Sequence, residues 1–137
     1  MFRAKGWKVN LENARLSGAI LQEARLMKAR LRNTHFHGAI LISANLKKAD
    51  LRGARFQRAR LQSAHFDKAV VLGAGFEDAN LKDTFFLGTR FDNASLKSIL
   101  RARNWEKAHF DFAVKQKLDD LRASCAAQPA KMAPKSS

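Results

Sequence analysis

Residues 44–51 read ANLKKADL, and this stretch holds two copies of the five-residue pattern that decides the fold. In each copy a small residue is followed two positions later by a large apolar residue, here Leu46 and Leu51. The pattern runs without a break from a centre at Leu11 to a centre at Leu96 and makes eighteen repeats. A short, fixed period of this kind indicates a solenoid whose stacked units bury one continuous core.

A period of five excludes both ordinary secondary structures for the repeat region. On an α-helix, five residues advance by roughly 500°, so the large residues would spiral over every face. On a flat strand, side chains alternate with period two, so each successive centre would change faces. The pattern is satisfied if the chain turns a corner in every repeat, because the small and the large residue can then both point inward.

A second period, of twenty residues, gives the number of corners in one coil. Phe36, Phe56 and Phe76 are twenty residues apart, and so are Phe66 and Phe86. Twenty residues are four repeats, which predicts a four-sided coil and, for eighteen repeats, about 4.5 coils. Coils about 4.8 Å apart would bring rings in one column into stacking distance.

The run of Ala-x-Leu/Phe-x-x repeats resembles the pentapeptide repeat family over Val9–Ser98. The resemblance implies an all-β fold, a right-handed quadrilateral β-helix, to which we add a short C-terminal capping α-helix. Asp or Asn is usual in this family at the position before the centre. This chain departs from that pattern with six arginines: Arg15, Arg25, Arg30, Arg55, Arg60 and Arg90.

Both ends of a solenoid expose apolar coils and need caps. We expect an N-terminal cap over residues 1–8, with Phe2 and Trp7 covering the first coil. The repeat region is assigned to residues 9–98, followed by a loop and a capping helix over residues 99–125. Residues 126–137, with two prolines, are predicted to be a disordered tail.

The capping helix is predicted from an apolar stripe. Val114, Leu118 and Leu121 recur at helical spacing, Cys125 continues the stripe, and Asp111 stands where an N-cap residue would be. The stripe is expected to cover the last coil. The alternative is that the stripe, or the last coil itself, forms a homodimer contact.

The chain has 137 residues and a formal net charge of +14, from 26 Lys and Arg against 12 Asp and Glu. Cys125 is its single cysteine, which excludes an internal disulfide framework and a cysteine-based zinc site. Residues 1–10 carry no apolar stretch typical of a secretory signal, and no segment is apolar enough to span a membrane. We therefore expect a cytoplasmic protein.

No catalytic motif is visible in the sequence. It lacks a glycine-rich phosphate loop, a nucleophile elbow and a recognisable cysteine–histidine pair. His35 and His37 flank the inward Phe36, and we interpret them as solvated histidines and not as a metal site. The chain is thus predicted to be no enzyme and to bind no cofactor or metal. Almost all Phe residues are inward, so few aromatic rings are expected outside for bases to stack on.

Two outward patches are the candidate binding sites. The four-sided coil gathers a basic column on one side: Arg25, Lys28, Lys47, Lys48 and Lys68. Beside it lies a small apolar patch of Ile20, Ile40 and Ile42. A ladder of like charges repels itself unless an anionic partner occupies it, although salt and splayed side chains reduce that repulsion. Apolar neighbours in stacked coils are typical of a protein contact.

These patches favour a non-enzymatic binding or scaffold module with a macromolecular partner, most simply a protein. The resemblance offers an alternative, because some pentapeptide repeat proteins mimic duplex DNA, bind DNA gyrase and protect it. A mimic of DNA needs an acidic surface, and the net charge of +14 opposes that function. A third alternative is direct binding of nucleic acid or of an anionic membrane surface.

Overall fold

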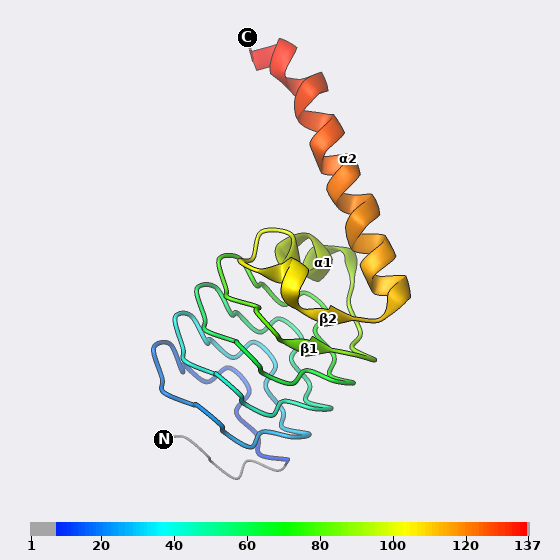
Figure 1. Ribbon diagram of the computed structural model, residues 1–137. Helices are drawn as coiled ribbons and strands as arrows, with labels where there is room; N and C mark the ends of the chain where they lie inside the picture. Colours follow the sequence, from blue (N-terminus) through cyan, green and yellow to red (C-terminus); the bar gives the residue numbers. More distant parts are fainter. Residues whose placement is uncertain (1–7, 137) are drawn as a thin grey trace.

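The computed structural model describes the backbone of residues 8–136 and the side chains of residues 8–124. Its body is a stack of coils that rises from the N-terminal to the C-terminal end (Figure 1). At the C-terminal end come four short elements and one long helix: β1 (Phe85–Phe86), α1 (Asn93–Ile99), the 3₁₀ turn η1 (Trp105–Lys107), β2 (His109–Phe110) and the long α2 (Phe112–Ser136).

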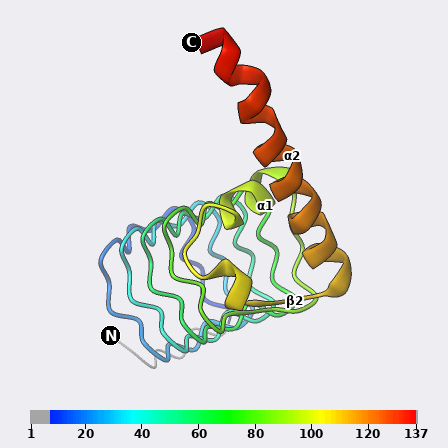
Figure 2. The same cartoon turned by 45° about the horizontal axis from the view of Figure 1, so that its top comes forward.

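Successive coils are joined by parallel β-bridges between residues twenty positions apart, such as Arg30 with Asp50 and Asp50 with Val70. The bridges continue in this register from Asn10 to Arg90. This confirms the prediction of four repeats in each coil. The open loops of successive coils lie over one another when the molecule is turned (Figure 2).

Each corner of the coil is a tight turn closed by one backbone hydrogen bond. The N–H of Ala14, for example, donates to the carbonyl of Leu11 at 3.0 Å. The third residue of every such turn has a positive φ, 62° at Asn13 and 61° at Lys48. A positive φ at this position is what a type II turn requires. The chain can therefore turn once per repeat and keep both the small and the large residue inward.

The core is formed by the two inward positions of each repeat. Ala44 and Leu46 are fully buried, as are most alanines and centres from residue 24 onward. Phe56 stacks between Phe36 and Phe76 with ring centroids 4.9 and 5.1 Å apart. A second ladder, Phe66–Phe86–Phe110, has centroid separations of 5.0 and 5.1 Å. Rings at twenty-residue spacing therefore do form continuous stacks.

Threonine replaces the small inward residue in three repeats. The hydroxyls of Thr34, Thr84 and Thr89 each donate to a carbonyl of the preceding coil at 2.8 Å. Each buried hydroxyl is thus satisfied, so the polar group does not weaken the core.

The outward bridged residues define four faces of the β-helix. In chain order they are face 1 (Arg15, His35, Arg55, Gly75), face 2 (Ile20, Ile40, Arg60, Asn80, Arg103), face 3 (Arg25, Asn45, His65, Phe85, His109) and face 4 (Asn10, Arg30, Asp50, Val70, Arg90). Face 2 is opposite face 4. Residues in one face are stacked at the coil spacing of about 4.8 Å.

The eighteenth predicted repeat, centred on Leu96, is a helix and not a β-helical corner. It lies in α1, which begins after Asp92 with a capping box: the Ser95 N–H donates to Asp92 Oδ1 at 2.8 Å, and the Asp92 N–H donates to Ser95 Oγ at 3.0 Å. The last residues of the region assigned to the repeats are therefore helical, from Asn93 onward, although they keep the five-residue pattern. Ala-Ser-Leu matches the repeat, but the cap and the helical spacing of Leu96 and Ile99 favour α1.

Side chains close the C-terminal end of the stack where another coil would otherwise supply carbonyls. Asp92 Oδ1 accepts the N–H of Gly73 at 3.1 Å, and Asp111 Oδ2 accepts the N–H of Gly88 at 2.8 Å. Ser98 Oγ accepts the N–H of Phe76 at 3.1 Å. Asp111 precedes α2 as predicted, but its carboxylate bonds Gly88 of the last coil. The end of the sheet is thus satisfied and offers no free edge at these positions.

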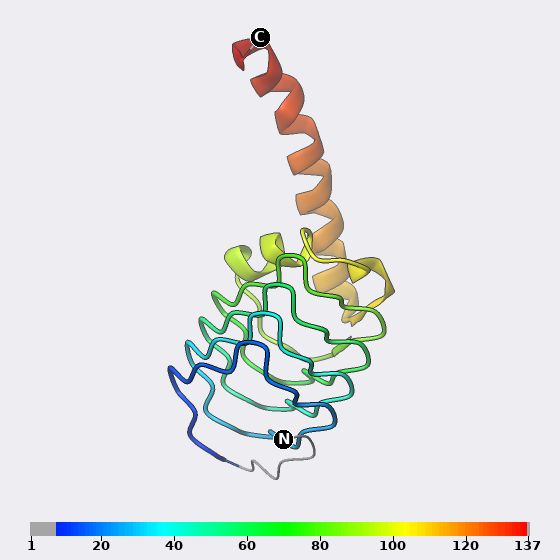
Figure 3. The same cartoon turned by 90° about the vertical axis from the view of Figure 1, so that its left-hand side faces the viewer.

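The helix α2 crosses the last coil and then extends away from it, with α1 beside its first turns (Figure 3). Leu118 is fully buried, while Val114 and Leu121 are partly buried against the core. Two cations lie over the ring of Trp105: Lys115 Nζ at 5.5 Å and the Arg122 guanidinium at 5.3 Å from its centroid. This packing is that of a cap.

The predicted tail differs from the structure, because α2 continues to Ser136. Alanine and lysine between residues 126 and 133 favour helix, whereas the composition argument weighed the two prolines and the serines. Residues 1–7 of the expected N-terminal cap, with Phe2 and Trp7, lie outside the described residues, as does the side chain of Cys125. Within the described part of the chain, no helix is long and apolar enough to cross a membrane.

The stacked rings make the central phenylalanine a sensitive test of the core. We expect Phe56→Ala to lower the free energy of unfolding by about 3–5 kcal/mol, because the ring is fully buried and the rigid coils cannot collapse into the cavity. Phe112→Ala is the matched control, since Phe112 is 85% exposed and should change stability by no more than about 0.5 kcal/mol. Urea unfolding measures both, and equal losses would contradict the ladder as a source of stability.

The cap makes a second prediction, about acid. Burial raises the pKa of Asp92, but hydrogen bonds from the N–H groups of Ser95 and Gly73 and from the Ser95 hydroxyl lower it by more, so it lies below the ordinary 3.8. A carboxyl with a depressed folded pKa stabilises the protein above its unfolded pKa, and that contribution is lost as the pH falls through the folded value.

We therefore expect the thermal midpoint of the wild type to fall more between pH 6 and pH 3 than that of Asp92→Asn. Asp120→Asn is the control, because Asp120 is exposed and forms no recorded interaction within the described part of the chain. An Asp92→Asn variant with the same acid sensitivity as the wild type would refute the assignment.

Candidate functional site

The structure brings the predicted basic column together at the corner between faces 3 and 4. Lys28, Lys48 and Lys68 all occupy left-handed turn positions, each with φ near 61°, and all are exposed. Lys47 lies beside them, and its carbonyl accepts the N–H of Lys28 at 2.9 Å. Arg25 is on face 3 of the same coil as Lys28. The column is thus a structural fact, while its role as a binding site stays a prediction.

The predicted apolar patch is also assembled by the fold. Ile20 and Ile40 are bridged neighbours on face 2, and Ile42 follows at the next corner. Ile20 is 52% exposed, while Ile40 and Ile42 are half-buried. The apolar patch therefore occupies the N-terminal half of face 2.

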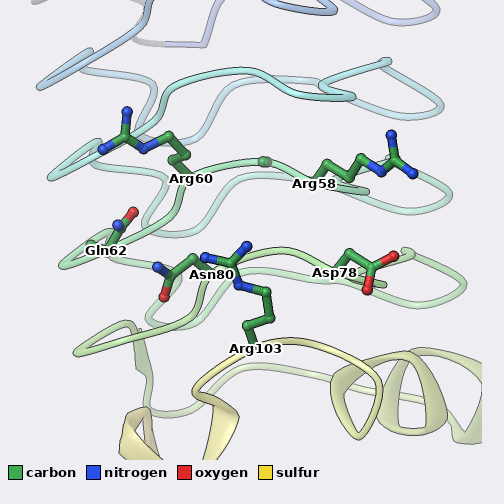
Figure 4. A pocket seen from close by; sticks show the side chains of 7 residues that line it. Arg58, Arg60, Gln62, Asp78, Asn80 and Arg103 are labelled. Carbon is green, nitrogen blue, oxygen red and sulfur yellow. The ribbon is translucent and has the colours of Figure 1, made fainter.

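The C-terminal half of the same face carries an arginine cluster that the sequence analysis did not find. Arg58, Arg60 and Arg103 line an open basin of about 400 Å³, together with Gln62, Asp78 and Asn80 (Figure 4). Arg60 is a bridged residue of face 2, and Arg58 occupies the left-handed turn position at the corner before it, with φ of 61°. Arg103 joins them because it is bridged to Asn80, which is itself bridged to Arg60. We call this the arginine basin.

Asn80 is held in one orientation at the centre of the basin. Its Oδ1 accepts hydrogen bonds from the Lys82 N–H at 3.2 Å and from Asn104 Nδ2 at 3.0 Å. With Oδ1 occupied, the amide nitrogen of Asn80 is left as a donor. The basin therefore presents guanidinium and amide N–H groups, which are donors suited to oxyanions.

Gln62 adds an unsatisfied acceptor to the lining of the basin. Its Oε1 is buried and has no hydrogen-bond partner within the described residues. A buried polar atom without a partner is costly, so a rotation of the side chain that brings this oxygen to an N–H or O–H donor would be favoured. Gln62 is at the corner position that Ile42 occupies one coil earlier.

The arginines of the basin have no carboxylate partner within 4 Å in the described part of the chain. Asp78 lines the basin without forming an ion pair. Two other arginines of the β-helix are paired, because Asp50 binds Arg32 Nε at 2.8 Å and Arg52 Nη2 at 2.7 Å. What distinguishes the basin is that three arginines without an ion pair among the described residues line the same hollow.

An outward aromatic stack was missed by the prediction that few rings lie outside. His65, Phe85 and His109 stack on face 3, with centroid separations of 4.6 and 4.8 Å. The rings cover one another, so both faces of Phe85 are occupied and cannot receive a base. Its sequence signal was the twenty-residue spacing of His65 and Phe85, but His109 follows after a shift in register.

A second hollow of about 460 Å³ lies over face 1, between Arg55 and α1. Its Gln57 donates to Glu77 at 3.4 Å, so its polar groups are partly paired. Among the described residues, no group of three or more His, Cys, Asp or Glu side chains could hold a metal ion.

The sequence pattern named Pentapeptide repeats matches residues 10–47, 19–58 and 55–97, with 8 copies of the repeat. Together these matches cover more than half of the chain. The chain belongs to the pentapeptide repeat family. Proteins of this family fold as right-handed β-helices, which is the architecture implied by the resemblance and by the stacked coils described above.

Solved pentapeptide repeat proteins are similar to this chain. HetL, involved in heterocyst differentiation regulation in the cyanobacterium Nostoc sp. strain PCC 7120, is 25% identical with a TM-score of 0.60, over 66% of this chain and 50% of its own. Rfr23 from the cyanobacterium Cyanothece 51142 is 31% identical with a TM-score of 0.39, over 76% and 61%.

QnrB1, a plasmid-mediated fluoroquinolone resistance protein, is 21% identical with a TM-score of 0.49, over 74% of this chain and 49% of its own. This pentapeptide repeat protein therefore spans about half the length of HetL and QnrB1. A search of curated proteins found no similar sequence.

The uncompensated charge of the basin predicts an unusual response to mutation. We expect the double variant Arg60→Gln and Arg103→Gln to raise the free energy of unfolding by roughly 0.2–0.5 kcal/mol at low ionic strength, because repulsion between cations is relieved. The gain should vanish at high salt. Arg32→Gln is the control, since it removes an ion pair with Asp50 and should not stabilise the protein. Thermal unfolding at two salt concentrations measures the effect, and a loss of stability in the double variant at both would contradict it.

Proposed function

We propose that this pentapeptide repeat protein is a non-enzymatic binding module that presents face 2 to a protein partner. The observation that carries the proposal is the division of one flat face into an apolar half, with Ile20 and Ile40, and a cationic half, with Arg60 and Arg103. Apolar contact supplies binding free energy, while unpaired charge selects and orients the partner. The partner surface therefore combines an apolar contact with an acidic group.

A protein explains both halves of face 2 better than a nucleic acid or a membrane headgroup layer does. Nucleic acid would use the arginines but leave the isoleucines facing a polar backbone. Asp78 within the basin also opposes a long polyanion. The basic column at the corner between faces 3 and 4 stays as a predicted second contact, and a cytoplasmic location stays a prediction.

Protection of DNA gyrase by imitation of DNA is less well supported. QnrB1 is a fluoroquinolone resistance protein, but this chain has a net charge of +14, and its outward columns are cationic where a mimic needs anionic groups. A gyrase supercoiling assay with the added protein addresses this alternative directly, and inhibition or protection at stoichiometric concentration would favour it.

The test of the proposed function is affinity capture from the native cells with the full chain and two matched variants. Ile40→Asp puts a carboxylate into the apolar half of face 2. Val70→Asp makes the same kind of change on the opposite face, where Val70 is also a half-buried bridged residue. We expect a nuclease-resistant protein partner that the wild type and Val70→Asp retain and that Ile40→Asp loses by at least about tenfold, because burying a charge without a partner is costly.

Three outcomes would contradict the proposal. Capture that Ile40→Asp leaves unchanged would exclude face 2 as the contact. Loss of capture in Val70→Asp alone would place the contact near the basic column instead. Loss of the captured material after nuclease treatment would indicate a nucleic acid as the ligand.

A further inference from the structure

We propose that the arginine basin is a binding site for a phosphoryl group on a phosphorylated segment of the partner protein. This inference rests on the proposed function, because it names the chemical group that face 2 recognises. It is carried by the donors that line the basin (Figure 4), by the unsatisfied acceptor of Gln62, and by the apolar patch one coil away.

The charge of the basin matches a phosphomonoester. Three guanidinium groups and one carboxylate line it, so the side chains leave an excess of two positive charges. A phosphorylated side chain carries close to two negative charges at neutral pH and three strong acceptor oxygens. Arg58, Arg60 and Arg103 offer forked N–H donors, which bind phosphate in the bidentate geometry that lysine cannot provide.

The geometry favours one localised dianion over a chain of phosphates. Arg60 and Arg103 are separated by Asn80 in a single column, and the fixed amide of Asn80 supplies a neutral donor between the two cations. Asp78 at the side of the basin repels further anionic groups. A nucleic acid backbone, with a charge at every nucleotide, would have to bring a second phosphate toward this carboxylate.

Gln62 indicates that the phosphoryl group is attached to a peptide. Its buried Oε1 needs a donor, and neither a phosphate dianion nor another acceptor provides one. Rotation of the half-buried Gln62 side chain would turn this oxygen outward, where a backbone N–H of a segment lying along face 2 would supply the donor. One coil before Gln62, Ile42 and Ile40 offer an apolar surface to a neighbouring side chain of the same segment.

The experiment is a titration of the full-length protein observed through its arginine Nε–Hε NMR signals. The probe is capped phosphoserine, with an acetyl group at its amino end and a methylamide at its carboxyl end. We expect saturable shifts at Arg58, Arg60 and Arg103, and at least about tenfold weaker binding to Arg60→Gln/Arg103→Gln. Arg30→Gln/Arg90→Gln is the matched control on face 4 and should bind as the wild type does, since both its arginines are exposed and face away from the basin.

A second variant separates the role of Gln62 from that of charge. Gln62→Leu removes the acceptor and keeps the three arginines, so it should bind capped phosphoserine more weakly. Its affinity for sulfate, a dianion with no donor, should stay the same. A loss of both affinities would show that the variant disturbs the basin. Unchanged affinity for both would show that Gln62 does not contact the peptide part of the ligand, and the assignment of the phosphoryl group to a peptide would be wrong.

Other probes give the results that would overturn the site. Shifts that grow linearly without saturation, or that appear equally at all arginines, would show unspecific screening. Equal affinity for capped glutamate would indicate an acidic segment and not a phosphorylated one. Saturable, tighter binding of a short DNA duplex at the same three arginines would assign the basin to nucleic acid.

Phosphatase treatment distinguishes failure of this inference from failure of the proposed function. We expect phosphatase treatment of the cell extract to abolish capture of the partner by the wild type. If capture survives phosphatase but is still lost in Ile40→Asp, face 2 binds a protein and the phosphoryl inference is wrong. If Ile40→Asp captures the partner as well as the wild type does, the proposed function itself is wrong.

Discussion

The inter-coil hydrogen bond that recurs every twenty residues is the interaction on which the rest of the structure depends. The N–H of Leu46 donates to the carbonyl of His65 at 2.8 Å, and the N–H of His65 donates back to Ala44 at 2.9 Å. Because these bonds recur in every coil, they fix the register of each coil against the next. The identity of a residue twenty positions away then decides what each side chain contacts, both in the core and outside.

Such a register turns the outer sequence into columns with fixed spacing. Where opposite charges share a corner or face, the column is neutralised, as at Asp50 between Arg32 and Arg52. Where like charges share one, rigid coils cannot move apart to relieve the repulsion. The arginine basin is thus electrostatically unfavourable in isolation, and an anionic partner would relieve this repulsion on binding.

The three lysines of the basic column also carry a cost in backbone strain. Lys28, Lys48 and Lys68 occupy left-handed backbone positions where glycine or asparagine is less strained. Gly88 continues the same column, and a Cβ at this position would lie 3.2 Å from Lys68 Cγ. Packing does not require lysine at these exposed positions, so the core gives no physical reason for the column.

The sequence predicts the β-helix well because the small and the large inward residue of each repeat determine the local backbone conformation. The twenty-residue spacing of the phenylalanines even predicts the core stacks. The prediction fails where a different local signal competes with the repeat. Asp92 and Ser95 form a capping box that starts α1 inside a perfect repeat, and Asp111 bonds Gly88 of the last coil. Neither choice is visible in the five-residue pattern, because each depends on which N–H groups the last coil leaves unpaired.

The candidate site was found only in part for the same reason. Ile20, Ile40 and Ile42 follow from the period, and so could Arg58 and Arg60. Arg103 does not, because α1 adds three residues to the last coil and the bridge from Asn80 is twenty-three positions long. The cap thus has a second effect besides closing the core. By shifting the register, it sets a third arginine in line with face 2 and leaves it without a carboxylate within 4 Å in the described chain. A shift back to twenty would place Leu100, an apolar residue, at that position, and the basin would lose the third guanidinium that completes it.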